Sequence, residues 1–166
     1  GEDGEEVPPG TSGTVELRTP SLLRCYRDGT DPVSPQGWYR TGDLGSIDPV
    51  THRLQVHGRA DDLIVTGGEN VWPAPVEALL ATHEAVREVA VVGEPDPDWG
   101  QRVVALVVPD GEPPSLASLR ELVKERLPVA AAPKELRLVD SLPRTALGKI
   151  RRSGLALDTA EERGDG

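Results

Sequence analysis

Three residues in this sequence could take part in the chemistry of a nucleotide phosphate. Asp43, in the segment WYRTGDL, carries a carboxylate that could accept two hydrogen bonds from a ribose diol. Arg59, in GRADDLIVTGGEN, keeps its proton and could pair with phosphate or ribose oxygens. Lys149, in LPRTALGKIR, follows a glycine and could swing into a site to stabilise negative charge on a phosphate oxygen during transfer.

Each residue also has an ordinary structural interpretation. A Gly-Asp pair such as the one containing Asp43 commonly caps a turn. Most lysines lie on the surface without a chemical role, so Lys149 alone indicates little. No single segment decides between the two interpretations, and the combination of segments carries the inference.

A pair of glycines, Gly67 and Gly68, follows Asp61, Asp62 and a short apolar run. Because glycine has no side chain, the pair permits positive φ angles and the close approach of a ligand to the backbone. A Gly-Gly pair more often marks a plain turn. Trp99, in DPDWGQ, is equally open, since a large ring in a polar loop either covers the edge of a core or stacks on a base.

The distribution of charge excludes one class of partner. The formal net charge is −10, and acidic residues are concentrated in GEDGEE at the start and in the stretch from Asp158 onward. We expect no nucleic-acid partner, because nucleic-acid binding needs a cationic surface that releases counterions. Residues 144–152 are an exception, with four cationic residues and no acidic one. This segment suits a phosphate-bearing small molecule or, more simply, a helix start with exposed arginines.

Composition also limits the compartment and the core. The single cysteine, Cys25, cannot form an internal disulfide, and no cysteine or histidine spacing is typical of a zinc site. No apolar segment is long enough to span a bilayer, and the start of the sequence lacks the features of a signal peptide. We expect a cytoplasmic protein with a modest core of valine, leucine, isoleucine and alanine, since phenylalanine and methionine are absent.

Residues 1–57 predict a β-rich element with too few strands to close on itself. Val15 and Leu17 alternate with charged residues, which is the period of a half-buried strand. We expect strands over residues 13–19, 22–26, 44–47 and 54–56. The last two flank the turn DPVTH. Such a set of strands is typical of the end of a larger domain.

A composition break at residues 58–62 precedes residues 63–157, which alternate strand and helix patterns. We expect strands at 63–65, 86–92, 103–108 and 136–139. A helix can start at Pro75, and Ser115 can cap a second helix whose apolar residues recur at helical spacing.

The fold class that follows is α+β, a small three-stranded sheet with flanking helices. We expect the first helix to run through Thr82, the second to end before Pro128, and a last short helix to start near Ile150. Residues 158–166 are rich in charge, and we expect a disordered tail there.

In this order, WYRTGDL, GRADDLIVTGGEN and LPRTALGKIR resemble the C-terminal part of the adenylate-forming (AMP-binding) superfamily over roughly residues 5–155. Members of this superfamily include acyl-CoA synthetases, peptide-synthetase adenylation domains and luciferases. They use ATP to activate a carboxylic acid as an acyl-adenylate and then transfer the acyl group to a thiol. DLIVTGGENVWPAPVE and ALGK are closer to CoA ligases, including o-succinylbenzoate–CoA ligases, than to peptide synthetases.

The resemblance implies domain alternation, in which a small lid domain rotates between the two half-reactions. It also implies roles for the candidate residues. Asp43 and Arg59 would bind the nucleotide, Asp61 would be the hinge, and Lys149 would be the catalytic lysine that bridges carboxylate and phosphate oxygens. The remaining residues would serve CoA: Gly67, Gly68 and Glu69 along the pantetheine path, Trp99 against the adenine, and Lys134 near a phosphate.

The resemblance further implies that residues 1–57 are the end of the large N-terminal AMP-binding domain, 58–62 the hinge and 63–157 the lid. The phosphate loop, adenine pocket, magnesium ligand and acyl pocket of the family have no counterpart in this sequence. We therefore expect an acid–thiol ligase that uses ATP, Mg²⁺ and CoA with a small carboxylic acid, and whose Mg²⁺ ligands lie in the missing N-terminal domain.

On this interpretation, we expect the 166-residue chain by itself to be inactive. Two alternatives stay open. One is an adenylation domain that loads a carrier protein, and the other is a non-catalytic binding module that retains the lid fold.

Overall fold

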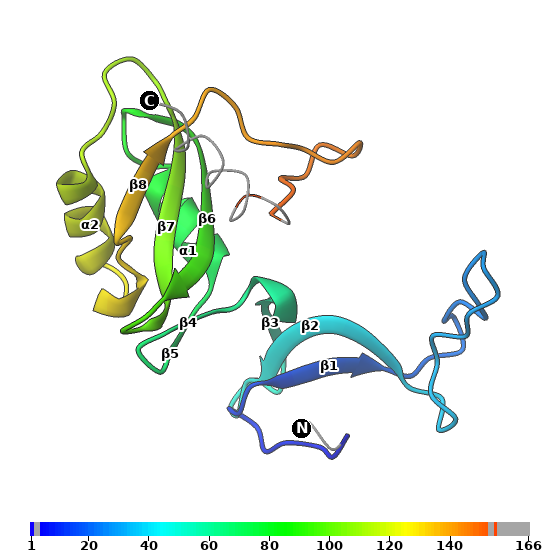
Figure 1. Ribbon diagram of the computed structural model, residues 1–166. Helices are drawn as coiled ribbons and strands as arrows, with labels where there is room; N and C mark the ends of the chain where they lie inside the picture. The colour runs from blue at the N-terminus through cyan, green and yellow to red at the C-terminus, as the bar shows by residue number, and fades with distance from the viewer. Residues whose placement is uncertain (2–3, 153–154, 156–166) are drawn as a thin grey trace. The chain divides into compact units, whose positions relative to one another are not determined.

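The computed structural model of the chain describes Gly1, residues 4–152 and Leu155 (Figure 1). The chain divides into two compact units, with the boundary between Asp61 and Asp62. Among the described helices, none has the length and apolar content that crossing a bilayer requires.

The first unit contains an antiparallel sheet with the strand order β1-β2-β3. The strands are β1 (Gly13–Leu17), β2 (Tyr39–Ile47) and β3 (Leu54–Arg59). The turn between β2 and β3 is held by Asp48, whose Oδ1 accepts hydrogen bonds from the backbone N–H groups of Val50 (3.0 Å) and Thr51 (2.6 Å). These bonds favour the ionised carboxylate and lower the pKa of Asp48. The predicted turn DPVTH is therefore present.

The expected strand over 22–26 is wrong, because this stretch forms turns. Asp28 and Asp31 each accept a hydrogen bond from a backbone N–H two residues further on, at 2.9 Å, which favours a turn over a ladder. Strand β2 is longer than predicted, since it begins at Tyr39 and not at Leu44. Gly42 and Gly45 lie within β2, and their missing side chains hid its alternating pattern.

The second unit is built on a five-stranded sheet around one central strand, β7. Its strands are β4 (Ile64–Thr66), β5 (Glu69–Val71), β6 (Val86–Asp96), β7 (Gly100–Pro109) and β8 (Glu135–Leu138). β7 pairs antiparallel with β6, antiparallel with β4 near Gly100, and parallel with β8. The α+β class and the three main strands are confirmed. The hairpin of β4 and β5 extends the sheet beyond the three strands expected.

Two α-helices and two 3₁₀ turns accompany these strands. They are α1 (Pro73–Leu80), α2 (Leu116–Lys124), η1 (Ala60–Asp62) and η2 (Val129–Ala131). Ser115 caps α2 as predicted, because its Oγ accepts a hydrogen bond from the N–H of Ser118 at 3.0 Å. α1 begins at Pro73, two residues earlier than expected. Residues 150–152 are not helical, and the rest of the helix expected from Ile150 lies outside the described residues, apart from Leu155.

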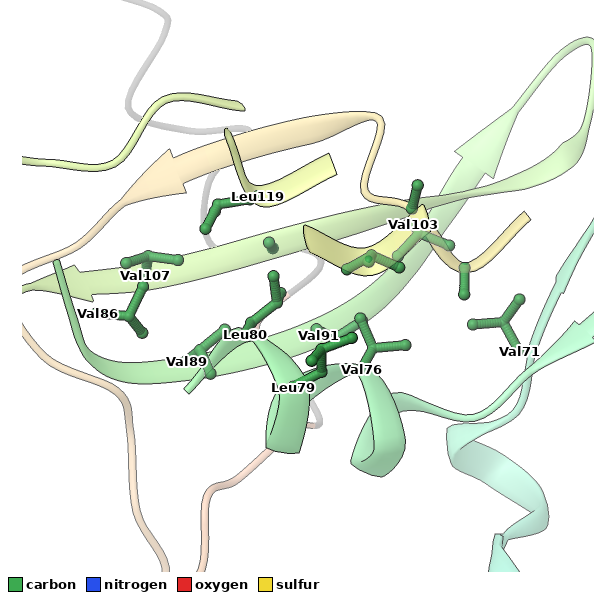
Figure 2. Packing of buried hydrophobic residues seen from close by; sticks show 14 of the residues in the cluster. Val71, Val76, Leu79, Leu80, Val86, Val89, Val91, Val103, Val107 and Leu119 are labelled. Carbon is green, nitrogen blue, oxygen red and sulfur yellow. The ribbon is translucent and has the colours of Figure 1, made fainter. Parts of the chain in front are cut away.

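The core of the second unit lies on both faces of β6 and β7. On one face, alternate residues such as Val103, Ala105 and Val107 meet side chains from α1 and α2, including Leu80 and Leu119 (Figures 1 and 2). The other face presents a second set of apolar residues: Ala90, Val92, Val104, Leu106 and Val108. Leu142, Ile150 and Leu155 from the C-terminal segment cover this second face. The segment that carries Lys149 is therefore attached to the sheet by apolar packing.

The burial of Leu119 gives a test of this core. Leu119 has no exposed surface, whereas Leu147 is 90% exposed. Replacing Leu119 by Ala should lower the free energy of unfolding of the second unit by about 2–5 kcal/mol, because the lost methyl groups leave a cavity. Leu147→Ala, the matched control, should change it by about 0.5 kcal/mol or less. Urea denaturation followed by circular dichroism measures both, and equal effects would contradict the described packing.

Candidate functional site

Asp43 and Arg59 face each other on neighbouring strands, β2 and β3. The Nη1 atom of Arg59 donates a hydrogen bond to the carbonyl oxygen of Thr41 at 2.6 Å and lies 3.4 Å from Oδ1 of Asp43. Asp43 lies within strand β2, so the Gly-Asp pair does not cap a turn here. Both side chains are partly exposed, at 33% for Asp43 and 52% for Arg59. The pair can therefore offer a carboxylate and a guanidinium to one polar ligand.

Gly42 lets the guanidinium lie close to β2. Its φ is +77°, and a Cβ at this position would lie 2.8 Å from Nη2 of Arg59. A side chain here would displace Arg59 and would also strain the backbone. Sequence reasoning did not select Gly42, although its place directly before Asp43 could have suggested a close contact.

Asp61, the predicted hinge, is exposed within η1. The next residue, Asp62, belongs to the second unit, where its Oδ2 lies 3.5 Å from Nη1 of Arg152. The hinge role of Asp61 stays a prediction. Its chain neighbour, however, has a defined ionic partner.

Gly67 and Gly68 form the two-residue turn between β4 and β5, with φ angles of +59° and +82°. Two consecutive positive φ angles are the geometry of a type I′ turn, which suits the twist of a hairpin. The ordinary interpretation of the glycine pair as a turn is therefore sufficient for its backbone. Glu69, the first residue of β5, is exposed beside it.

Trp99 lies against this turn. Its backbone carbonyl accepts a hydrogen bond from the N–H of Gly67 at 2.9 Å, and a Cβ on Gly67 would lie 2.7 Å from Cε3 of the ring. Lys134 Nζ stands over the ring, 3.5 Å from its centroid, which is a cation–π contact. Half of Trp99 is exposed. The structure thus brings Gly67, Trp99 and Lys134 together around one accessible indole.

Lys149 lies at the end of a tight hairpin over 144–150, closed by a bridge between Arg144 and Ile150. The N–H of Thr145 donates to the carbonyl of Lys149 at 2.7 Å, and the N–H of Gly148 donates to the carbonyl of Thr145 at 2.8 Å. Gly148 has a φ of +82°, which the turn requires. The side chain of Lys149 is exposed. Its backbone is therefore fixed while its ammonium group is free to move.

The four cations of 144–152 do not form one open patch. Arg144 pairs with Glu88 at 2.6 Å, and Arg152 pairs with Glu77 at 2.6 Å. Within the described residues, Lys149 and Arg151 have no carboxylate partner. These two cations are the part of the segment that remains available to a phosphate-bearing ligand.

A group of charged residues that sequence reasoning missed lies on the sheet. Glu94 on β6 is only 6% exposed, and it pairs with Arg102 on β7 and with Arg137 on β8. Glu135 pairs with the same two arginines, at 3.1 and 2.7 Å. Hydrogen bonds to Glu94 and Glu135 raise the pKa of Arg137 above its ordinary value. A glutamate directly after the apolar run 89–93 was the available indication of a buried ion pair.

The described residues contain no group of three or more histidine, cysteine, aspartate or glutamate side chains that could hold a metal ion.

Residues 75–149 match the family model of the AMP-binding enzyme C-terminal domain. This region of the chain is therefore similar to the C-terminal domains of AMP-binding enzymes. The match ends at Lys149 and includes Trp99 and Lys134. The recognition made from the three motifs is confirmed, and with it the assignment of the α+β fold.

Known proteins are similar over nearly the whole chain. The chain is 41% identical to the indoleacetate–CoA ligase of Aromatoleum aromaticum over 156 residues, which are 92% of the chain and 30% of that ligase. It is 44% identical to the probable 2-succinylbenzoate–CoA ligase of Mycobacterium tuberculosis over 165 residues, which are 96% of the chain and 43% of that protein. The chain thus spans less than half the length of these relatives.

A solved structure gives the same result for the fold. The o-succinylbenzoate CoA synthetase (MenE) of Bacillus subtilis, in complex with its acyl-adenylate intermediate, superposes with a TM-score of 0.83 at 36% identity. The superposition covers 92% of this chain and 32% of that protein.

The turn of the C-terminal domain gives a paired test. Gly67→Ala and Gly68→Ala should each cost about 1–2 kcal/mol of stability, because both residues have positive φ. Only Gly67→Ala should also move the indole of Trp99, since nothing lies within 4 Å of a Cβ on Gly68. The NMR shift of the Trp99 Nε1–H reports this movement. Equal shifts in both variants would contradict the contact.

Proposed function

We propose that this chain is the lid-bearing part of an ATP-dependent acyl-CoA ligase that activates a carboxylic acid and transfers the acyl group to CoA. The observation that carries the proposal is the identity of 41–44% to two CoA ligases over more than nine-tenths of the chain. In the first half-reaction, a carboxylate oxygen attacks the α-phosphorus of ATP and pyrophosphate leaves. In the second, the thiol sulfur attacks the adenylate carbonyl carbon and AMP leaves.

In this proposal, Asp43 and Arg59 bind the nucleotide. Arg59 is already held by the carbonyl of Thr41, so it needs little reordering to meet a ligand. Asp43 is partly exposed and can accept hydrogen bonds from ribose hydroxyls, which are strong because the acceptor is charged. Gly42 supports the pair by leaving room for the guanidinium.

Lys149 serves the first half-reaction. An ammonium group on a fixed backbone can approach the carboxylate and phosphate oxygens and stabilise the charge that develops as they react. Its exposure and its lack of a carboxylate partner among the described residues support this role, because no ion pair must be broken first. Asp61 is proposed as the hinge about which the domain alternates.

CoA would pass along Gly67, Gly68 and Glu69 and place its adenine on Trp99. The half-exposed indole supports this assignment because aromatic rings stack on bases. The ammonium group of Lys134 stands over the ring, so in this proposal it turns aside when adenine binds and meets a phosphate of CoA. We assign no magnesium ligand to the described residues. We place the Mg²⁺ of the ATP step in the N-terminal domain of the longer enzyme, and we place that enzyme in the cytoplasm.

A graft tests the role of Lys149. This chain would replace the matched region of the probable 2-succinylbenzoate–CoA ligase of Mycobacterium tuberculosis. Lys149→Ala should lower ATP–pyrophosphate exchange by about 10²–10³-fold, as for the loss of one transition-state donor. Thioester formation from supplied acyl-adenylate should stay within about threefold of the unsubstituted graft, less than 1 kcal/mol of barrier.

The control is Arg151→Ala, which removes a neighbouring exposed cation. It should leave both half-reactions nearly unchanged. Equal loss of both half-reactions in Lys149→Ala would refute the assigned role.

Calorimetry with CoA tests the thiol path in the 166-residue chain. Trp99→Ala should weaken CoA binding by about 1–3 kcal/mol, the usual contribution of one base stacked on an aromatic ring. Trp38→Ala is the matched control, because Trp38 also has a cation over its ring, Arg18 at 4.7 Å. If the affinity for CoA is the same in Trp99→Ala, Trp99 is not the residue on which the adenine stacks. The absence of measurable CoA binding would instead favour a carrier protein as the acceptor, since its pantetheine has no adenine.

A further inference from the structure

Arg152 lies three residues after Lys149 and contacts two carboxylates on other parts of the second unit. Its Nη2 donates to Oε2 of Glu77 on α1 at 2.6 Å, and its Nη1 lies 3.5 Å from Oδ2 of Asp62. The second oxygen of Glu77, Oε1, accepts a hydrogen bond from the N–H of Val91 at 2.8 Å. One guanidinium therefore connects the C-terminal segment, a helix and a strand.

The position of Val91 explains what Glu77 does there. β6 is the last strand in the sheet order, so one of its edges has no neighbouring strand. Val91 is fully buried, and an unsatisfied N–H on such an edge would cost free energy. Glu77 satisfies this N–H with one oxygen and binds Arg152 with the other. The ion pair is thus anchored to the sheet and is not a contact between two mobile surface side chains.

The side chains of Arg152, Glu77 and Asp62 are mostly shielded from solvent. Their exposed fractions are 29% for Arg152, 15% for Glu77 and 27% for Asp62. The Nε atom of Arg152 is buried and has no hydrogen-bond partner in the described part of the chain. Burying a guanidinium in this way costs free energy that only its ion pairs can offset. The arrangement therefore favours one fixed geometry of Arg152.

Leu142 and Leu155 pack the C-terminal segment on the sheet, and three described residues at or just beyond the ends of the Lys149 hairpin attach the hairpin itself. Arg144, at its start, binds Oε2 of Glu88 and also the carbonyl of Gly148. Ile150 packs against the apolar second face of the sheet. Arg152 supplies the third attachment, directly after the hairpin. Without it, the segment after Ile150 would lack its ionic anchor.

We propose that Arg152 is a positioning residue that, through Glu77 and Asp62, holds the Lys149 hairpin in a fixed relation to the chain leaving the hinge. Asp62 directly follows Asp61, so a rotation at Asp61 carries Asp62, Arg152 and the hairpin as one body. The consequence for adenylation rests on the function proposed above. The claim that Arg152 holds the hairpin in place does not rest on that function, because it concerns contacts within this chain alone.

Hydrogen exchange of the ¹⁵N-labelled 166-residue chain tests whether Arg152 holds the hairpin in place. Arg152→Gln should speed exchange of the Gly148 and Arg151 amides about 5- to 30-fold, the change that one or two kcal/mol produces. The amide of Leu106, in the centre of β7, should exchange at its original rate. Arg151→Gln is the matched control, and it should change neither the exchange of the Gly148 amide nor that of the Leu106 amide.

Two further variants separate positioning from general stability. Glu77→Ala, which removes the acceptor of the Val91 N–H, should speed the exchange of the same hairpin amides and of Val91, whereas Asp62→Asn should affect only the hairpin. Arg152→Lys should restore part of the protection, because lysine keeps the positive charge. The restoration should be incomplete, because an ammonium group cannot bind two carboxylates with a planar fork. Equal acceleration of all amides, or unchanged hairpin amides in Arg152→Gln and Asp62→Asn, would overturn the proposal.

The grafted ligase tests the consequence for catalysis. Arg152→Gln should lower kcat of ATP–pyrophosphate exchange about tenfold, or 1.4 kcal/mol of barrier, and leave KM for ATP and the thioester step unchanged. If Lys149→Ala has no effect, the proposed function fails while the exchange result stands. If the hairpin amides of Arg152→Gln keep their protection, the positioning role fails whatever Lys149→Ala does.

Discussion

The burial of both faces of β7 is the constraint on which the second unit depends. The residues from Val103 to Val108 are apolar and each is at most 1% exposed, so both sides of the strand must be covered. α1 and α2 cover one side, and the C-terminal segment supplies the apolar side chains that cover the other side in the described part of the chain. The segment that carries Lys149 is thus part of the core, because Leu142 and Ile150 beside its hairpin help to exclude water from the sheet.

Four arginines around the second face of the sheet are held in ion pairs. Arg102 and Arg137 are bound by Glu94 and Glu135 at the polar end of the same face, and Arg144 and Arg152 are bound at its apolar end and edge. Buried or half-buried pairs of this kind contribute little net stability, but removing one partner is costly. They therefore fix geometry more than they add free energy. Among the described residues, Lys149 has no carboxylate partner beside these fixed cations, which suits the role proposed for it.

Much of this arrangement could be predicted from local patterns. The apolar runs gave the strands at 86–92 and 103–108, Ser115 gave the start of α2, and three ordered motifs gave the family. What could not be predicted depends on contacts between distant residues: the glycines in β2 hid its length, and no local pattern shows that Arg152 meets Glu77 or that Trp99 lies on Gly67. The strand expected over 22–26 failed because nearby aspartates bind the backbone and no neighbouring strand competes.

The same reasoning explains why Trp99 and Lys149 lie on or beside turns, while the carboxylates that hold the Lys149 hairpin, Glu88 and Glu77, lie on a strand and a helix. A tight turn with a positive-φ glycine, at Gly67 or Gly148, needs no packing to hold its shape, so it can present Trp99 or Lys149 to solvent. Such a turn cannot determine where it points, because that depends on what lies at its ends. At the Lys149 hairpin these ends are Arg144 and Ile150, with Arg152 just beyond. In the proposed function, Lys149 reaches a reacting phosphate in one pose and leaves it in another. This division suits that role, because the side chain is exposed while the backbone is held at the ends of the hairpin.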